Sequence, residues 1–303
     1  MNNSNVTFTQ TPDAFTLYSI IVGFSTIILN ITLLIMIAIF KMDCDSNRFI
    51  FIAEMSTAAL ISGVTGSIRD LQRFSGRSYS SINTACKILM IINVSCVQMD
   101  LLNLFGVVVD QYLLIAWPFK YHNILPRRRA LMLACLPPLG FGANTITMML
   151  IWDEKFLCTF YHNLPMWYLV MTCFTAGIIP VSCITILQFL TIRISRCHMR
   201  QIQSGPNKAS AETIRRHWSG VVTTSLICSM VFLTWIPTLL SILWYAIDGI
   251  GLESPSFTKF ATVTAIIVYP HGIWIPLIYA IRSPEIRPIY DKIKAHCCCK
   301  GVT

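Results

Sequence analysis

Seven long apolar stretches are the feature that most restricts how this chain can fold. They lie at residues 15–40, 49–68, 86–117, 130–152, 166–192, 218–247 and 257–281. A membrane-spanning helix needs about 20 predominantly apolar residues, so each stretch is long enough to cross a bilayer. Glu54 interrupts the second stretch, which makes it the weakest of the set. The pattern predicts an all-α membrane protein built as a seven-transmembrane helix bundle.

Composition and charge agree with a chain that faces lipid. Hydrophobic residues make up 54% of it and charged residues only 12%, whereas ordinary soluble domains contain about 25% charged residues. The formal net charge of +9 could indicate a nucleic-acid partner, but the charges lie in short segments between apolar runs. We therefore expect the positively charged segments to contact membrane lipids, and we expect no nucleic-acid partner.

The distribution of lysine and arginine predicts the orientation. Most of these 23 residues fall on one side of the predicted bundle, and the other side carries Arg69, Arg73, Arg77, Lys87, Lys155 and Lys259. The positive-inside rule places the richer side in the cytoplasm. We expect a multi-pass plasma-membrane protein with an extracellular tail at 1–14, a transmembrane domain at 15–281 and a cytoplasmic segment at 282–303.

Both ends of the chain carry candidate modification sites. Asn2 and Asn5 begin glycosylation sequons on the polar tail, whereas Asn30 and Asn93 begin the same pattern inside apolar stretches, where it cannot be glycosylated. After the seventh stretch, apolar residues at helical spacing predict a short amphipathic helix on the inner leaflet. The thiols beyond it are candidates for palmitoylation, with unmodified cytosolic thiols as the alternative: Cys297, Cys298 and Cys299.

Three short motifs occur in order along the third, sixth and seventh stretches. Residues 110–112 read Asp-Gln-Tyr, residues 234–237 read Thr-Trp-Ile-Pro, and residues 275–279 read Ile-Pro-Leu-Ile-Tyr. They resemble the Asp-Arg-Tyr, Cys-Trp-x-Pro and Asn-Pro-x-x-Tyr motifs of the rhodopsin-like (class A) G-protein-coupled receptor family. The segment after residue 112 looks most like the melanocortin and lipid-receptor branch of that family.

The resemblance implies a ligand site among the outer helix ends and a switch that couples it to a heterotrimeric G protein. The ligand would be a small molecule, a lipid or a peptide. The expected ligand-binding residues are mostly apolar: Arg69, Met90, Asn93, Val94, Val97, Thr172, Ala176, Trp235, Thr238, Ile242, Ala265 and Tyr269. The expected switch residues are Asp100, Asp110, Gln111, Tyr112, Trp235, Pro237, Pro276 and Tyr279.

Two of these positions argue against particular ligands. Asn93 stands where amine receptors have Asp, so a classical monoamine is disfavoured. Tyr269 stands where opsins have the lysine that binds retinal, so no retinal cofactor is expected. Arg69 could meet a polar or acidic end of a ligand, or it could be a solvated loop charge.

Among the cysteines, Cys86 and Cys158 lie at the edges of apolar stretches on the expected outer side. There they would face an oxidising exterior and can form a disulfide that ties the outer loop to the third helix. Most other cysteines lie inside apolar runs, where they behave as small hydrophobic residues. No Cys-x-x-Cys pair with a matching second pair occurs, so no metal site is expected.

The chain departs from the family pattern at its inner positions. Gln111 replaces the family's Arg, and we consider whether the basic run Arg127 to Arg129 partly substitutes for it. Ile275 replaces the Asn before Pro276, and Gln188 stands where a fifth-helix Tyr is usual.

The family's buried second-helix acid aligns with Ala59, whereas Asp100 occupies the third helix. We propose that the buried acid has moved between neighbouring helices. Asn30 and His271 are its candidate neighbours, and a sodium ion is a possible occupant, because a buried carboxylate needs a partner.

The function expected from this reasoning is ligand-driven signalling to a heterotrimeric G protein. One alternative is a receptor-fold protein that binds a ligand but signals weakly or constitutively, because Gln111 and Ile275 alter the inner switch. Another is a chemosensory or odorant-type receptor. A transporter is disfavoured because no inverted repeat is apparent. An enzyme is not expected, since the loops are too short for a catalytic domain and no catalytic motif occurs.

Overall fold

Long helices dominate because a backbone that crosses lipid must pair its N–H and C=O groups internally. The computed structural model describes residues 14–39, 47–74, 79–153, 163–203, 208–248 and 255–282. Within these residues, seven helices are long and apolar enough to span a membrane: Ala14–Ile39, Arg48–Gln72, Thr84–Ala116, Arg127–Ile151, Met166–Arg200, Trp218–Ile247 and Pro255–Arg282. The predicted fold class, an all-α seven-helix bundle, is confirmed.

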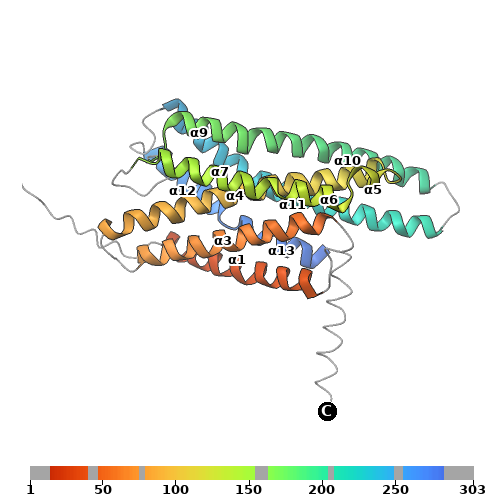
Figure 1. Ribbon diagram of the computed structural model, residues 1–303, viewed down its shortest axis with the longest axis horizontal. Helices are drawn as coiled ribbons and strands as arrows, with labels where there is room; N and C mark the ends of the chain where they lie inside the picture. The colour runs from red at the N-terminus through yellow and green to blue at the C-terminus, as the bar shows by residue number, and fades with distance from the viewer. Residues whose placement is uncertain are drawn as a thin grey trace, which may run out of the picture.

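The spans lie side by side in one bundle, and successive spans run in opposite directions (Figure 1). The elements in chain order are α1 (Ala14–Ile39), α3 (Arg48–Phe74), α4 (Tyr79–Ala116), α5 (Tyr121–Ile124), α6 (Arg127–Ala134), α7 (Leu136–Ile151), α9 (Met166–Thr172), the π-helix η1 (Cys173–Ile178), α10 (Ile179–Gln203), α11 (Lys208–Asp248), α12 (Pro255–Val268) and α13 (His271–Arg282). We call the end at which α1 begins the amino end of the bundle. The end at which α13 finishes is the carboxyl end.

Prolines interrupt the fourth, fifth and seventh spans, because proline lacks the N–H that a helix needs. The fourth span is divided at Cys135, so that Pro137 falls in the first turn of α7, where no N–H is required. In the fifth span, Pro180 directly follows the π-helix, where the Ile179 N–H reaches back to the Phe174 carbonyl. Pro237 and Pro276 remain inside α11 and α13.

The break in the seventh span comes from Pro270, which the sequence analysis had not singled out. α12 ends at Val268 and α13 begins at His271. A regular helix would pair the N–H of residue 270 with the carbonyl of Ile266, and proline cannot supply that N–H. The hydroxyl of Tyr18 in α1 donates to this carbonyl at 2.9 Å. A side chain of the first span therefore satisfies a backbone group of the seventh.

The second span is longer than predicted. α3 continues to Phe74, so Arg69 and Asp70 lie within a helix, and only 8% and 1% of their surfaces are exposed. The interpretation of Arg69 as a solvated loop charge is therefore wrong. The reason is that the two opposite charges pair with each other, which lets a charged helical turn remain buried.

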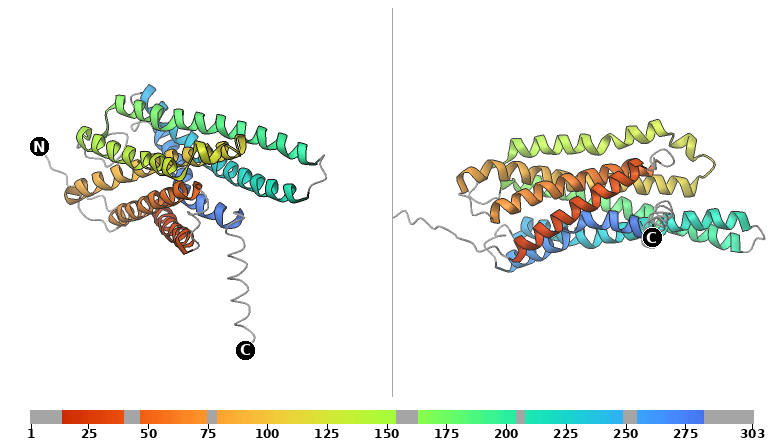
Figure 2. Two further views of the ribbon diagram at one scale, coloured as in Figure 1. Left: turned by 45° about the vertical axis from the view of Figure 1, so that its right-hand side comes forward. Right: turned by 90° about the horizontal axis from the view of Figure 1, so that it is seen from below.

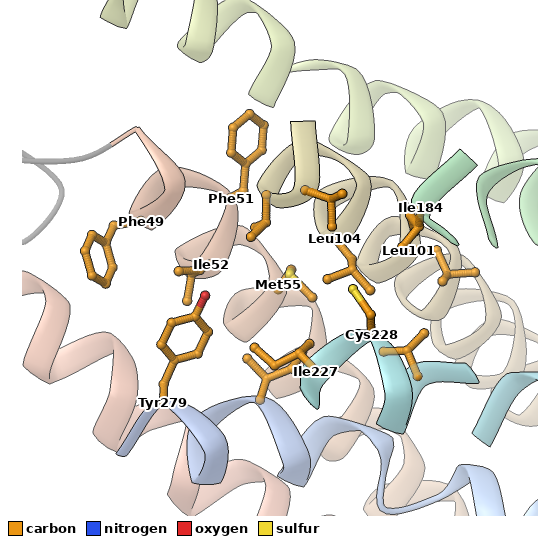
Figure 3. Close-up of a cluster of buried hydrophobic side chains, with 14 of the residues drawn as sticks. Phe49, Phe51, Ile52, Met55, Leu101, Leu104, Ile184, Ile227, Cys228 and Tyr279 are labelled. Carbon is orange, nitrogen blue, oxygen red and sulfur yellow. The ribbon is translucent and has the colours of Figure 1, made fainter. Parts of the chain in front are cut away.

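The core is formed chiefly where α3 packs between α1 and α4. Figure 2 shows α1 running beside α3 on one flank and beside α13 on the other. The main hydrophobic cluster draws side chains from α1, α3, α4, α10, α11 and α13 (Figure 3). In that view the ring of Tyr279 from α13 points toward Ile52 of α3. A second cluster, near the amino end, includes Ile91, Met148, Leu169 and Ile242.

Some predicted features lie outside the described residues. These are the glycosylation sites Asn2 and Asn5, the amphipathic helix after residue 282, and the cysteines Cys158, Cys297, Cys298 and Cys299. Cys86 is disulfide-bonded and 2% exposed, and its expected partner Cys158 is among the residues not described.

Close packing between α3 and α4 yields a stability prediction. A Cβ on Gly106 would lie 2.6 Å from two ring carbons of Phe51, which is buried and cannot withdraw freely. We expect Gly106→Ala to destabilise the protein by about 1–3 kcal/mol through overpacking. Thermal unfolding of purified protein measures the loss.

Gly142→Ala is the matched control. Gly142 also lies in a helix, and a Cβ there would meet no atom within 4 Å. We expect this variant to keep its Tm or gain slightly, because alanine has the higher helix propensity. Equal losses in the two variants would contradict the proposed contact.

Candidate functional site

Candidate site residues gather at three levels of the bundle. At the amino end, Arg69 of α3 is the centre of a buried polar cluster. Its Nε lies 3.1 Å from Asp70 Oδ1, and its Nη2 donates to the hydroxyl of Tyr269 beside the helix break. Its Nη1 lies 3.7 Å from the sulfur of Met90 in α4. The structure thus brings together three predicted ligand-binding residues, Arg69, Met90 and Tyr269.

The charge of this amino-end cluster is balanced. Asp70 neutralises the Arg69 guanidinium, and the Asp70 Oδ2 atom has no hydrogen-bond partner among the described residues. Phe15 of α1 packs edge-on against Tyr269, with ring centroids 5.6 Å apart. Because Arg69 is already paired with a carboxylate, an acidic ligand group is less expected to bind it.

The other predicted ligand-binding residues are more dispersed. Asn93 turns toward α3, where its Nδ2 donates to the carbonyl and hydroxyl oxygens of Ser62 at 3.1 and 3.0 Å. Val94 and Ile242 pack in the cluster near the amino end, and Val97 and Trp235 pack in the main cluster. The remaining four are half-buried on α9, η1, α11 and α12: Thr172, Ala176, Thr238 and Ala265.

At the middle level, His271 joins three helices. Its Nε2 lies 3.7 Å from Asp100 Oδ2 of α4, and its ring packs edge-on against Trp235 of α11, with centroids 6.2 Å apart. The next residue, Gly272, accepts a hydrogen bond from Asn30 of α1 at 2.9 Å. Asp100 is 2% exposed and faces the interior. Of its two candidate neighbours, His271 contacts the acid, whereas Asn30 bonds the adjacent backbone.

The described contact of Asp100 gives no support to a sodium ion. Sodium is a hard cation that prefers oxygen ligands, but the group facing Asp100 Oδ2 is an imidazole nitrogen. Ala59, at the position of the family's acid, supplies no oxygen side chain. The contact of Asp100 Oδ2 is thus with a nitrogen atom 3.7 Å away, and we derive no role for sodium.

At the carboxyl end, Asp110 is held by a hydrogen-bonded chain. The Tyr121 hydroxyl donates to Asp110 Oδ1 at 2.6 Å, and Asn47 Nδ2 lies 3.2 Å from that hydroxyl and 3.0 Å from the Leu125 carbonyl oxygen. Burial raises the pKa of Tyr121, and the neighbouring Asp110 carboxylate raises it further. Tyr121 therefore keeps its proton at physiological pH and remains a hydrogen-bond donor.

Gln111 lies beside this chain but faces α11. It is 4% exposed, and a Cβ placed on Gly220 of α11 would lie 3.7 Å from its Nε2. The same Cβ would lie 3.3 Å from Nη1 of Arg48, the first residue of α3.

In the basic run after α5, the bonds of Arg129 are directed to nearby backbone. Arg129 donates to the carbonyls of Asn123 and Ile124 at 3.1 and 3.0 Å, and Arg127 and Arg128 are exposed.

The other predicted switch residues are also accounted for. Tyr112 is half-buried and packs edge-on against the exposed Trp117, with centroids 5.7 Å apart. Tyr279 and Ile275 are buried in the main cluster, and Pro276 is buried within α13. Pro237 is half-buried within α11.

Sequence reasoning missed several residues of the carboxyl end. Arg48 was counted only as a positive charge near a membrane face, and Asn47, Tyr121 and Ser225 carried no motif. Gln188 was noted as a departure, and the structure shows its Nε2 donating to Ser225 of α11 at 2.5 Å. The only signal in the sequence that could have indicated these contacts is the presence of a polar residue at the edge of an apolar span.

Comparison with known proteins identifies the family. A family model described as 7 transmembrane receptor (rhodopsin family) matches residues 11–279. The chain therefore belongs to the rhodopsin family of seven-transmembrane receptors, as the motifs predicted. With its seven span-capable helices, it is a multi-pass membrane protein.

Curated relatives agree with this family. Melanocortin receptor 5 from Rattus norvegicus is 24% identical over 200 residues, a match that covers 66% of this chain and 56% of that receptor. Adenosine receptor A2b from Homo sapiens is 25% identical over 243 residues, covering 71% of this chain and 69% of that receptor. The chain thus spans little more than half the length of the melanocortin relative.

The Asp100–His271 pair can be tested with a double-mutant cycle. Removing one partner of a buried pair leaves the other without compensation, so we expect His271→Phe alone to be strongly destabilising. Adding Asp100→Asn should recover part of that loss, with a coupling energy of at least about 1 kcal/mol. Thermal unfolding of the four proteins gives the coupling, and additive losses would show that the residues do not interact.

The poor fit of sodium gives a separate prediction. Replacing Na⁺ by K⁺ at constant ionic strength should leave the Tm of the protein unchanged, because the imidazole faces Asp100 in place of a metal. A higher Tm in Na⁺ than in K⁺, lost in Asp100→Asn, would contradict this prediction.

Proposed function

We propose that this protein is a plasma-membrane receptor that binds a ligand at its amino end and signals to a heterotrimeric G protein at its carboxyl end. The observation that carries the proposal is a line of interhelical contacts that follows the seventh span. Tyr269 contacts Arg69 at the amino end, and His271, just beyond the break, contacts Asp100 and Trp235. A ligand that displaced Tyr269 would act directly on the backbone that positions His271.

The proposed orientation rests on charge. Arg127, Arg128 and Arg129 begin the fourth span at the carboxyl end, and the last turn of α13 contributes Arg282. The positive-inside rule favours a cytoplasmic location for that end and an extracellular location for the amino end.

The chemistry of the amino end supports a predominantly apolar ligand. Its one described guanidinium, that of Arg69, is already paired with Asp70, and Asn93 is hydrogen-bonded to Ser62. Met90, Val94 and Ile242 add apolar surface. Of the small-molecule, lipid and peptide classes, we propose a small molecule or lipid with a limited polar group. A hydrogen-bond donor on the ligand would match the unpaired Asp70 Oδ2.

We propose a receptor rather than an enzyme, because the family to which the chain belongs consists of receptors. The alternative is a receptor-fold protein that binds ligand but signals weakly or constitutively. Two substitutions favour this alternative. Gln111 stands where the family's motif has a charged Arg, and Ile275 stands where it has a polar Asn.

Basal G-protein dissociation in cells tests the proposal. We expect the native chain to activate at least one G-protein type above an empty-vector control at matched surface expression. Gln111→Arg introduces the family's guanidinium, and Gln111→Met, of similar length and without charge, is its control. Activity that appears only in Gln111→Arg would favour the weakly signalling alternative. Silence of all three proteins, with and without a panel of small-molecule and lipid ligands, would contradict receptor signalling.

A further inference from the structure

We propose that Asn144 is a positioning residue at the amino end of the bundle: it joins Ser95 of α4 to Tyr168 of α9 and keeps the fifth span packed against α11. We call these three side chains the amino-end relay. The relay deepens the proposed function, because it gives the ligand site a route to the sixth span beside the line that follows the seventh. Its effect on signalling rests on that function, whereas the packing itself is a structural property.

The amide of Asn144 is bonded at both of its ends. Its Nδ2 donates to Ser95 Oγ at 2.8 Å, and its Oδ1 accepts a hydrogen bond from the Tyr168 hydroxyl. Thr145, the next residue of α7, also donates to Ser95 Oγ, at 3.0 Å. Ser95 is 0% exposed and Tyr168 is 6% exposed. Such hydrogen bonds between polar side chains hold neighbouring helices together in a membrane, so the relay joins α4, α7 and α9.

The packing of Tyr168 extends the relay to the sixth span. Tyr168 and Cys173 lie in the apolar cluster near the amino end, and so does Leu239 of α11. The π-helix η1 begins at Cys173, directly after α9, and a Cβ on its Gly177 would overlap the side chain of Leu239. This close approach of η1 to α11 requires a residue without a side chain. The position of α9 and η1 therefore fixes where α11 can lie.

The position of Ser95 connects the relay to the proposed ligand site. The two preceding residues, Asn93 and Val94, are predicted ligand-binding residues. Asn93 is bonded to α3, and Val94 packs against the apolar cluster. One turn of α4 is thus bonded to α3 through Asn93 and to α7 through Ser95. A ligand that shifts this turn acts on Tyr168 through Asn144, and on α11 through the packing of Tyr168.

Two native thiols allow the relay to be tested without a ligand. Cys173 and Cys228 are 1% and 2% exposed, but Cys173 packs in the cluster near the amino end and Cys228 packs in the main cluster. The experiment measures how fast N-ethylmaleimide modifies each thiol in the full-length protein in nanodiscs, by mass spectrometry of peptides. Cys173 reports opening between the fifth and sixth spans, and Cys228 reports general loosening of the bundle.

Two variants break the relay. Asn144→Leu removes both ends of the amide at similar size, and Tyr168→Phe removes a single hydroxyl, which keeps the proposal testable if Asn144→Leu does not fold. Each should raise the modification rate of Cys173 by on the order of fivefold, the effect of losing about one interhelical hydrogen bond, and leave the rate of Cys228 unchanged. The double variant should match Asn144→Leu, because both changes break the same link.

Thr147→Val is the matched control. Thr147 also lies in α7, but its hydroxyl donates to the Ala143 carbonyl of its own helix at 2.9 Å. This variant should keep the native rate at Cys173. Gly177→Val pushes η1 away from α11 while the relay stays intact, so it should raise the rate at Cys173.

The thiol rates also decide against the proposal. An unchanged rate at Cys173 in both relay variants would overturn it. A rise of the same size at Cys228, or in Thr147→Val, would overturn it as well, because the loosening would then not be specific to the relay.

Basal G-protein activation at matched surface expression separates this inference from the proposed function. A faster Cys173 reaction together with raised basal activation in Tyr168→Phe supports both. A faster reaction without G-protein activation in any of the proteins supports the relay and counts against the signalling function. A faster reaction with unchanged activation, in a native chain that signals, would overturn the route from the relay to α11.

Discussion

The structure depends on one constraint: each backbone N–H and C=O group that enters lipid must find a partner inside the protein. Helices meet this requirement along most of each span, and prolines are the places where it fails locally. Pro137 begins a helix, where its missing N–H is not needed. Before Pro180, a π-helix shifts the hydrogen-bond register. At Pro270, a side chain from another helix completes the backbone bonding.

The same constraint governs the polar side chains. Buried polar groups are stable in this bundle where they pair across helices. Arg69 bonds to Tyr269 of another span at the amino end, and His271 lies near Asp100 of another span in the middle. At the carboxyl end, Asp110 bonds to Tyr121 of the short helix α5. Because α11 and α13 take part in the contacts around His271, a movement of either helix changes more than one level of the bundle.

The number and approximate positions of the spans could be predicted because length and apolar composition are local properties of the sequence. The family could be predicted for the same reason, since each motif is contiguous. The partners of individual charges could not, because they depend on which faces of distant helices meet. Ser225 carries no motif, and only the packing of α10 against α11 shows that it accepts a hydrogen bond from Gln188.

The surroundings of Asp100 could be predicted only in part. Sequence reasoning placed an acid in the interior and named His271 as a neighbour, since a buried carboxylate needs a partner. Whether that partner was a metal ion or a side chain required the geometry of α13, and this geometry depends on the break at Pro270. The proline that sets this geometry was the one that the sequence pattern did not single out.

The bond from Tyr18 to the Ile266 carbonyl has a consequence for biogenesis. Protein synthesis delivers the amino-terminal helix first, so Tyr18 is already in the membrane when the last span emerges. The seventh span leaves a carbonyl of its own backbone unpaired and reaches its lowest free energy only after docking against the first. Insertion of the last helix and closure of the ring of helices are therefore coupled steps, and a chain that lost its first span would retain a defect at the far end of its sequence.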